Sequence, residues 1–225
     1  MHTRIIALRP EPGLSSTLAA GQAAGLEITG HALSEIRPLS WDCPDPDSFD
    51  ALLIGSANAI RHGGAALAQL IDKPVYAVGR ATAQVARDAG FTVVMRGEGG
   101  LQKVLDAAPR PIHFLRLAGF DRVELMPPPG VSFGEVVAYE SVALPLDPAL
   151  FEGGDGSFIA LLHSATQAVH FANECDRLEI DKSEISLAAL GARISHAAGS
   201  GWRSIHTPEH PNDEALLAMV AKLCL

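Results

Sequence analysis

The stretch AVGRATAQVARDAG (residues 77–90) runs from an apolar segment through a glycine into a sequence with helical spacing. It predicts a β-strand, a tight turn and an α-helix, with free backbone N–H groups at the start of the helix. The stretch contains no cysteine and no histidine, and its first carboxylate is Asp88. Such a turn is suited to holding an anion through its backbone.

Apolar segments alternate with helical patterns along most of the chain, which predicts parallel sheets covered by crossover helices. Strands are expected at about 4–9, 27–33, 51–55, 75–78, 92–95, 112–116, 135–143, 158–163, 186–190 and 203–206. Helices are expected near 13–24, 57–70, 81–89, 99–108, 165–176, 193–199 and 212–223.

The chain also contains two similar halves. DALLIGSANAIRHGG followed by KPVYAVGRATAQVARDAGF parallels FIALLHSATQAVHFANE followed by ISLAALGARISHAAGSGW. Two stretches rich in proline, glycine, serine and aspartate, 37–50 and 141–157, are typical of linkers. The sequence therefore predicts an α/β protein with two similar lobes. Residues 1–36 plus 146–225 form a discontinuous lobe and residues 40–140 a continuous one, with linkers near 37–42 and 139–147.

Four turns are expected at the carboxyl ends of strands, where open α/β sheets bind their ligands. They are 55–58 (GSAN), 79–82 (GRAT), 163–166 (HSAT) and 191–193 (GAR). Helix N-termini that add a hydroxyl, an amide or an arginine suit carboxylates or phosphates. The candidate anion-binding residues are Ser56, Ala57, Asn58, Arg80, Ala81, Thr82, Ser164, Ala165 and Arg193.

Each of these residues also has a purely structural explanation. Ser56, Thr82 and Ser164 stand where helix N-caps are expected, and each can serve only to close its own helix. Arginines such as Arg80 and Arg193 are common on solvated surfaces. Only the repetition of the pattern favours a binding role.

Composition excludes several classes of partner. The net charge of −9 and the aromatic content of 5% argue against nucleic acids and against anionic membrane surfaces. A small molecule is the expected partner. No apolar run approaches about 18 residues and no secretory segment is recognisable, so a cytoplasmic location is expected.

Other site chemistries fail on spacing. The cysteines, Cys43, Cys175 and Cys224, are too far apart for a zinc ribbon or a disulfide framework. The pair His206 and His210 is interrupted by a proline, which argues against a metal site. Neither a dinucleotide-binding nor a P-loop glycine pattern is present, so no cofactor is expected. A cofactor-free reaction or plain binding remains.

The ordered set LRP (8–10), ALLIGSANAIR (51–61), YAVGRATAQVARDAGF (76–91), VVAYES (136–141), LLHSATQAV (161–169) and ALGARI (189–194) resembles the uroporphyrinogen-III synthase family. This resemblance implies two flavodoxin-like lobes joined by a two-stranded linker. It also implies a monomeric lyase that cyclises hydroxymethylbilane in haem and cobalamin synthesis. This linear tetrapyrrole carries eight carboxylates and would bind in the cleft between the lobes.

The resemblance assigns roles residue by residue. Tyr139 matches a tyrosine proposed to protonate the departing hydroxyl of the substrate, although packing at the hinge between the lobes explains it equally well. Thr82, Ser56 and Ser164 match the hydroxyl residues of the family turns, and Arg9 matches the arginine of the first strand.

The sequence departs from the family pattern in two places. The turn at 191–194 (GARI) lacks the usual hydroxyl pair, so Arg193 is the expected substitute, with Ser195 one place later. After the strand at 112–116, RLAGFDRVEL precedes three prolines, which predicts a truncated helix and leaves Arg116 or Arg122 as the binding arginine. A non-catalytic two-lobed module that binds or senses anionic metabolites, or a degenerate family member, remains the alternative.

Overall fold

The computed structural model describes residues 3–152 and 157–224, which form two compact units. Unit 1 consists of Met1–Glu35 with Ala143–Leu225, and unit 2 is Ile36–Val142. The linker-like stretch 141–157 includes residues 153–156, which lie outside the described part of the chain. Each unit has a sheet of parallel strands, to which unit 2 adds one antiparallel edge strand, with a hydrophobic core on either face, which confirms the predicted α/β class.

The sheet of unit 1 has five parallel strands in the spatial order β2-β1-β9-β10-β11. Counted along the unit this order is 2-1-3-4-5, that of flavodoxin-like folds, and it reverses between β1 and β9. The strands are β1 (Arg4–Ala7), β2 (Ile28–Gly30), β9 (Phe158–Leu162), β10 (Ile185–Ala189) and β11 (Ser204–His206).

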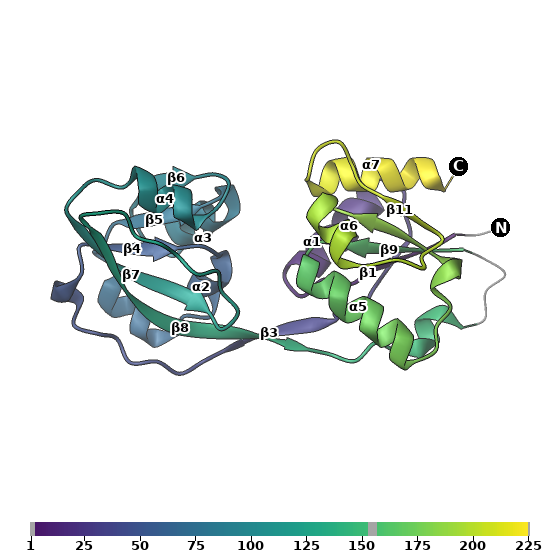
Figure 1. Ribbon diagram of the computed structural model, residues 1–225, viewed down its shortest axis with the longest axis horizontal. Coiled ribbons are helices and arrows are strands. Elements are labelled where there is room, and N and C mark those ends of the chain that lie inside the picture. The colour runs from purple at the N-terminus through teal and green to yellow at the C-terminus, as the bar shows by residue number, and fades with distance from the viewer. Residues whose placement is uncertain (1–2, 153–156, 225) are drawn as a thin grey trace. The chain divides into compact units, whose positions relative to one another are not determined.

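Helices flank the sheet of unit 1 (Figure 1), and alternating side chains of its central strands supply the two cores, as period-2 strands require. In β1, Ile5 and Ala7 face the helices α1 and α7, whereas Ile6 and the following Leu8 face α5 and α6. The helices are α1 (Gly13–Ala23), α5 (Ala165–Arg177), α6 (Ala192–Ala197) and α7 (Asp213–Leu223).

The sheet of unit 2 has the order β3-β8-β7-β4-β5-β6. Its strands are β3 (Ser34–Pro38), β4 (Ala51–Ile54), β5 (Val75–Val78), β6 (Val93–Gly97), β7 (Ile112–Gly119) and β8 (Val131–Ala143). Its helices α2 (Ala57–Arg61) and α3 (Arg80–Asp88) cover one face, and α4 (Leu101–Ala107) covers the other.

Apart from β3, the two sheets are the same arrangement with a permuted chain order. Strands β4, β5 and β6 of unit 2 take the places that β9, β10 and β11 take in unit 1. Strands β7 and β8 take the places of β1 and β2, so the two strands that open unit 1 correspond to the two that close unit 2. The sequence repeat lies within this shared three-strand part: its copies end at Phe91 and Trp202, just before β6 and β11.

Strand β3 was not expected: the sequence predicts no strand between 33 and 51, and β3 spans the predicted end of the first lobe segment at 36 and the start of the linker at 37. It pairs with β8, which begins at Val131 rather than near residue 135. The N–H of Leu39 donates to the carbonyl of Ala138, and the N–H of Leu144 donates to the carbonyl of Leu33, each at 2.9 Å. From the first bond to the second, the residue number falls from 39 to 33 on one segment and rises from 138 to 144 on the other. The two connecting segments therefore form an antiparallel ribbon.

The single helix predicted over 57–70 is also wrong. Helix α2 ends at Arg61, and Gly64 then adopts a φ of 68°, a left-handed conformation that favours glycine. The chain continues as a short 3-10 helix, η2. The 3-10 helices are η1 (Pro46–Ser48), η2 (Ala65–Leu70), η3 (Pro148–Phe151) and η4 (Lys182–Glu184).

Candidate functional site

The four predicted turns divide into two kinds. In the first kind a serine caps the following helix: Ser56 Oγ accepts a hydrogen bond from the N–H of Asn58 at 3.2 Å, and Ser164 Oγ accepts one from the N–H of Gln167 at 3.2 Å. Both serines therefore have the capping role that their positions allow. Ala57 is buried at the start of α2, and Ala165 is half-buried at the start of α5. Their part in binding stays a prediction.

The second kind of turn has a glycine at the cap position and no capping side chain. Gly79, with a φ of 80°, precedes α3, and the first N–H groups of that helix have no side-chain acceptor. Thr82 is not a cap, because it is the third residue of α3; it is 6% exposed. Arg80 and Ala81 lie exposed beside it. This turn keeps the donor set of an anion site.

The corresponding turn of unit 1 is weaker. Gly191 precedes α6 without a capping side chain, but α6 has only six residues. Arg193 is exposed, and the hydroxyl of Ser195 donates to the carbonyl of Ala192 at 2.9 Å within its own helix. Ser195 therefore does not replace the missing hydroxyls of this turn, and Arg193 remains the candidate.

Tyr139 lies at the carboxyl end of the unit 2 sheet with its ring against a glycine. A Cβ on Gly119, its partner on β7, would be 2.7 Å from Cζ of the ring. The His62 ring at the end of α2 lies 6.5 Å away, centroid to centroid. Burial, and to a lesser extent Arg61, lowers the pKa of His62, which favours its neutral form. Tyr139 is thus half-buried in a defined position.

Arg116 is a buried cation on β7. Its side chain is 6% exposed; Nη1 pairs with Glu135 at 2.9 Å, and Nη2 donates to the carbonyl of Val123 at 2.9 Å. Arg122 contacts the other carboxylate oxygen of Glu135 and donates to the carbonyl of Phe120 at 2.8 Å. Burial lowers the pKa of Arg116, while Glu135 opposes this effect. Both arginines hold the irregular loop after β7, and a substrate role for Arg116 stays a prediction.

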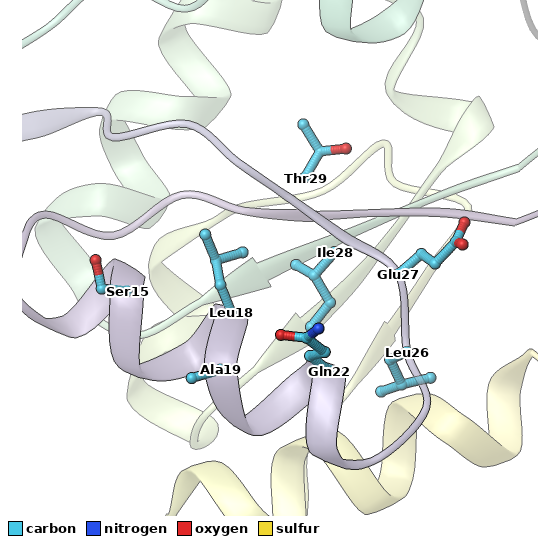
Figure 2. Close-up of a pocket in the computed structure, with 8 residues that line it drawn as sticks. All are labelled: Ser15, Leu18, Ala19, Gln22, Leu26, Glu27, Ile28 and Thr29. Carbon is cyan, nitrogen blue, oxygen red and sulfur yellow. The ribbon is translucent and has the colours of Figure 1, made fainter.

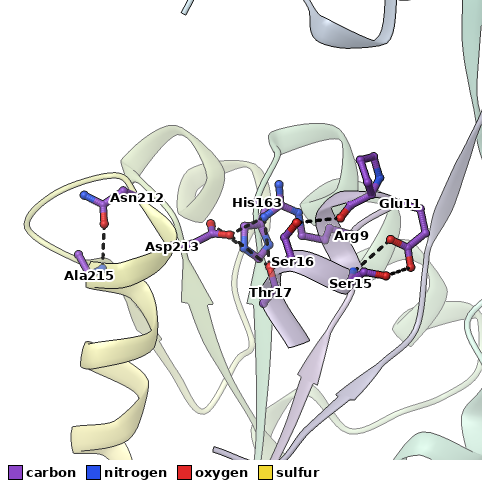
Figure 3. Close-up of polar contacts among 10 residues, drawn as sticks. Arg9, Glu11, Ser15, Ser16, Thr17, His163, Asn212, Asp213 and Ala215 are labelled. Carbon is purple, nitrogen blue, oxygen red and sulfur yellow. Dashed lines mark hydrogen bonds and ion pairs between the residues drawn. The ribbon is translucent and has the colours of Figure 1, made fainter. Parts of the chain in front are cut away.

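Arg9 follows β1 and lies in a polar cluster of unit 1 (Figure 3). Its Nη1 donates to Asp213 at 2.8 Å and to the Thr17 hydroxyl at 3.2 Å. The pKa of Asp213 lies below its ordinary value because His163, Arg9 and Thr17 favour the charged form against the opposing effect of burial. Sequence reasoning did not select Asp213 or Gly119, and it placed His163 in a predicted turn without selecting it as a site residue, since no local pattern marks residues that meet only in the fold.

A shallow hollow of about 570 Å³ lies between α1 and the edge strand β2 (Figure 2). No predicted site residue lines it; its lining residues are Ser15, Leu18, Ala19, Gln22, Leu26, Glu27, Ile28 and Thr29.

In residues 3–152 and 157–224, no three His, Cys, Asp or Glu side chains gather in a way that could hold a metal ion. None of the helices in these ranges has the length and hydropathy of a membrane span.

The fold is similar to that of solved uroporphyrinogen-III synthases. The chain matches the Helicobacter pylori enzyme with a TM-score of 0.69 and 17% identity, covering 98% of this chain and 99% of that one. A mutant Thermus thermophilus enzyme matches with a TM-score of 0.56 and 14% identity, covering 98% of each chain. No curated protein sequence matches significantly. The family model described as uroporphyrinogen-III synthase HemD matches residues 15–218. The chain therefore belongs to the uroporphyrinogen-III synthase family.

Proposed function

We propose that the protein is a uroporphyrinogen-III synthase that closes hydroxymethylbilane into uroporphyrinogen III with loss of water. The family match over residues 15–218 carries the proposal, because this range contains Tyr139 and all four predicted turns. The solved enzymes, at 14–17% identity, support the fold alone. We further propose that the protein acts as a monomer in the cytoplasm, and size-exclusion chromatography with light scattering tests the monomer.

In the proposed reaction Tyr139 gives a proton to the hydroxyl on the ring A methylene carbon. The carbon–oxygen bond breaks, water leaves, and the ring A pyrrole nitrogen supplies the electron pair. The substituted carbon of ring D bonds to the methylene carbon and forms a spiro intermediate. The bond from ring D to its original methylene then breaks and re-forms at the unsubstituted ring D carbon. That carbon releases a proton, which balances the one that Tyr139 gave.

The position of Tyr139 supports this role. Its ring lies along β7 at Gly119, and its backbone carbonyl accepts a hydrogen bond from the N–H of Phe120 at 2.8 Å, so ring and backbone are both held. A fixed proton donor contributes roughly 10²- to 10⁴-fold to a rate. Arg116 and Arg122 both pair with the carboxylate of Glu135 on β8, the strand that also carries Tyr139.

The uncapped turn before α3 supports the binding step. Its free N–H groups, the buried Thr82 and the exposed Arg80 together offer an anion site of backbone and side-chain donors. Binding several carboxylates in this way would hold a flexible chain in a reactive curl, which lowers the entropic part of the barrier.

The test is to incubate the protein with hydroxymethylbilane and to separate the porphyrin isomers after oxidation. Spontaneous closure gives the uninverted isomer I, so we expect isomer III well above the no-enzyme background. Tyr139→Phe should reduce isomer III formation by about 10²-fold or more. Tyr76→Phe is the matched control, because Tyr76 is the other tyrosine of the chain and packs edge-on against Phe114 in the core.

An absence of isomer III with the wild-type chain would overturn the proposed activity. It would leave the non-catalytic anion-binding module as the better description. An unchanged rate in Tyr139→Phe would assign Tyr139 to packing and remove it from the reaction.

A further inference from the structure

A cluster of four polar residues lies where the strand order of unit 1 reverses. Arg9 follows β1, His163 follows β9, Thr17 lies on α1, and Asp213 is the first residue of α7. Open α/β sheets bind ligands at this point, outside the carboxyl ends of the two strands. Figure 3 shows the side chains of Arg9, His163 and Asp213 converging there.

Asp213 divides its two carboxylate oxygens between the other members of the cluster. Oδ2 accepts from Arg9 Nη1 at 2.8 Å and from the Thr17 hydroxyl at 3.3 Å. Oδ1 lies 3.4 Å from His163 Nε2, an ion-pair distance without the geometry of a hydrogen bond. Asp213 therefore fixes one end of Arg9 and one side of His163.

Arg9 uses only part of its donor capacity. Nη1 makes both of its hydrogen bonds, and Nε and Nη2 have no hydrogen-bond partner within the described residues. A Cβ on Gly13 would be 2.4 Å from Nε and 2.7 Å from both Cζ and Nη2, so the flat guanidinium lies over this glycine. The in-plane N–H groups of Nε and Nη2 form the edge that a carboxylate accepts bidentately.

His163 supplies the second observation. Its side chain is only 5% exposed, yet neither Nδ1 nor Nε2 has a hydrogen-bond partner within the part of the chain that the structure describes. Buried polar groups in folded proteins nearly always form hydrogen bonds. A buried imidazole without a hydrogen bond, next to an arginine with free N–H groups, therefore indicates a missing ligand. The ligand must offer an acceptor to both.

We propose that Arg9 and His163 form a carboxylate-binding site within unit 1, with Asp213 as the positioning residue that holds both. Arg9 would bind the carboxylate through its Nε and Nη2 edge, and His163 would donate a ring N–H. The assignment of this carboxylate to an arm of hydroxymethylbilane rests on the proposed function, whereas the site itself does not.

The charges of the cluster give the site a testable property. The charged groups around His163 are Asp213 on α7 and, through Asp213, Arg9 at the end of β1; α1 and the start of α5 contribute the neutral Thr17 and Ser164. Arg9 and Asp213 cancel each other. An arriving carboxylate therefore meets no net charge from this ion pair, and a ring N–H of His163 is the neighbouring donor that its binding should engage.

The experiment titrates the full-length, ¹⁵N-labelled protein with tricarballylate, a tricarboxylate, and follows the histidine ring nitrogens by NMR. His163→Gln assigns the His163 signals. In the wild type we expect a saturable shift of the His163 ring-nitrogen signals as a ring N–H forms a hydrogen bond to the carboxylate. Arg9→Lys keeps the charge but loses the bidentate edge, and should raise the Kd at least fivefold. Arg87→Lys, at the exposed end of α3, is the matched control and should leave the Kd unchanged.

A His163 signal that does not respond to tricarballylate would overturn the site, and so would an equal Kd in Arg9→Lys. The isomer assay then separates the two proposals. Isomer III formation without any tricarballylate effect would contradict the proposed carboxylate site but support the proposed synthase activity. Saturable tricarballylate binding without isomer III formation would support the carboxylate site but contradict the proposed synthase activity. If both hold, Arg9→Lys should raise KM for hydroxymethylbilane about fivefold with kcat within twofold.

Discussion

Gly119 and Tyr139 are paired across β7 and β8 so closely that a side chain at position 119 would have to displace the tyrosine ring: a Cβ would lie 2.7 Å from Cζ and 2.9 Å from the hydroxyl oxygen of Tyr139. The pairing coincides with a register shift between β7 and β8 at Ala118 and Gly119. A backbone position therefore determines where the proposed proton donor stands.

Gly119→Ala should displace the Tyr139 ring and lower kcat by about 10²-fold, because a misplacement of about 1 Å can cost that much. The isomer assay measures this loss, and circular dichroism checks that the fold is kept. The sharper measurement is the double variant with Tyr139→Phe. If Gly119 acts through the hydroxyl of Tyr139, adding Gly119→Ala to Tyr139→Phe should cost less than about twofold. Fully additive losses of kcat would show that Gly119 does not act through the hydroxyl of Tyr139.

Thr82→Val tests the buried hydroxyl of α3 at nearly constant volume. The Thr82 side chain has no hydrogen-bond partner within the described residues, so valine should not destabilise the fold. Loss of one hydrogen bond to the substrate, worth about 0.5–1.5 kcal/mol, should raise KM by about two- to tenfold. Thr82→Ser keeps the hydroxyl and should retain the wild-type KM. A wild-type KM in Thr82→Val would make this residue a packing element of the helix.

Glu135→Gln should loosen the loop after β7. The substitution removes the carboxylate that faces both Arg116 and Arg122 and leaves a buried guanidinium without its counter-charge. We expect a loss of about 1–3 kcal/mol in the free energy of unfolding, the cost of leaving a buried donor without its partner, and faster hydrogen exchange in residues 120–126. Glu124→Gln is the control, because Glu124 is an exposed carboxylate of the same loop. Equal stability of the two variants would show that the arginines do not depend on Glu135.

Glu174→Gln should change the acid side of the stability profile. Arg177, at 2.7 and 2.8 Å, and the N–H of Leu146, at 2.8 Å, hold the pKa of Glu174 at about 2, below its ordinary 4.5. A lowered folded-state pKa stabilises the protein above pH 4.5, and this stability is lost as the pH falls toward 2.

Urea unfolding between pH 3 and 7 measures this effect. Above pH 5 we expect Glu174→Gln to be less stable than the wild type by about 1–2 kcal/mol, and the difference should narrow below pH 4.5. Glu184→Gln, at an exposed glutamate of the same unit, should follow the wild-type profile. A difference that does not change with pH would mean that the Glu174 carboxylate is not preferentially charged in the folded state.

The fold was largely predictable because its signals are local. Apolar runs such as ALLI at 51–54 and FIALL at 158–162 are buried on both faces of a parallel sheet and need no partner to be recognised. Strand β3 was missed because SEIRP carries three polar residues and a proline, and it becomes a strand only by pairing with β8. Propensity alone cannot show such tertiary pairing.

The candidate site was less predictable. The helix starts were visible in the sequence, but the serines and Thr82 looked alike there, and only the fold separates two capping serines from a buried threonine inside α3. Arg9 and Asp213 are 204 positions apart, so their ion pair has no local signature. Arg116 looked like a free cation because its partner Glu135 lies on a different strand.

The permuted strand order of the two sheets implies that unit 2 can be deleted without interrupting the strand order of unit 1. Unit 2 is one uninterrupted segment whose entrance and exit run through hydrogen-bonded neighbours, β3 and β8. Splicing Glu35 directly to Ala143 would remove that segment and leave a minimal five-stranded protein whose strands still follow the 2-1-3-4-5 path. Unit 2 is therefore a domain inserted between β2 and β9 of unit 1, and it has the same strand arrangement in a circularly permuted chain order.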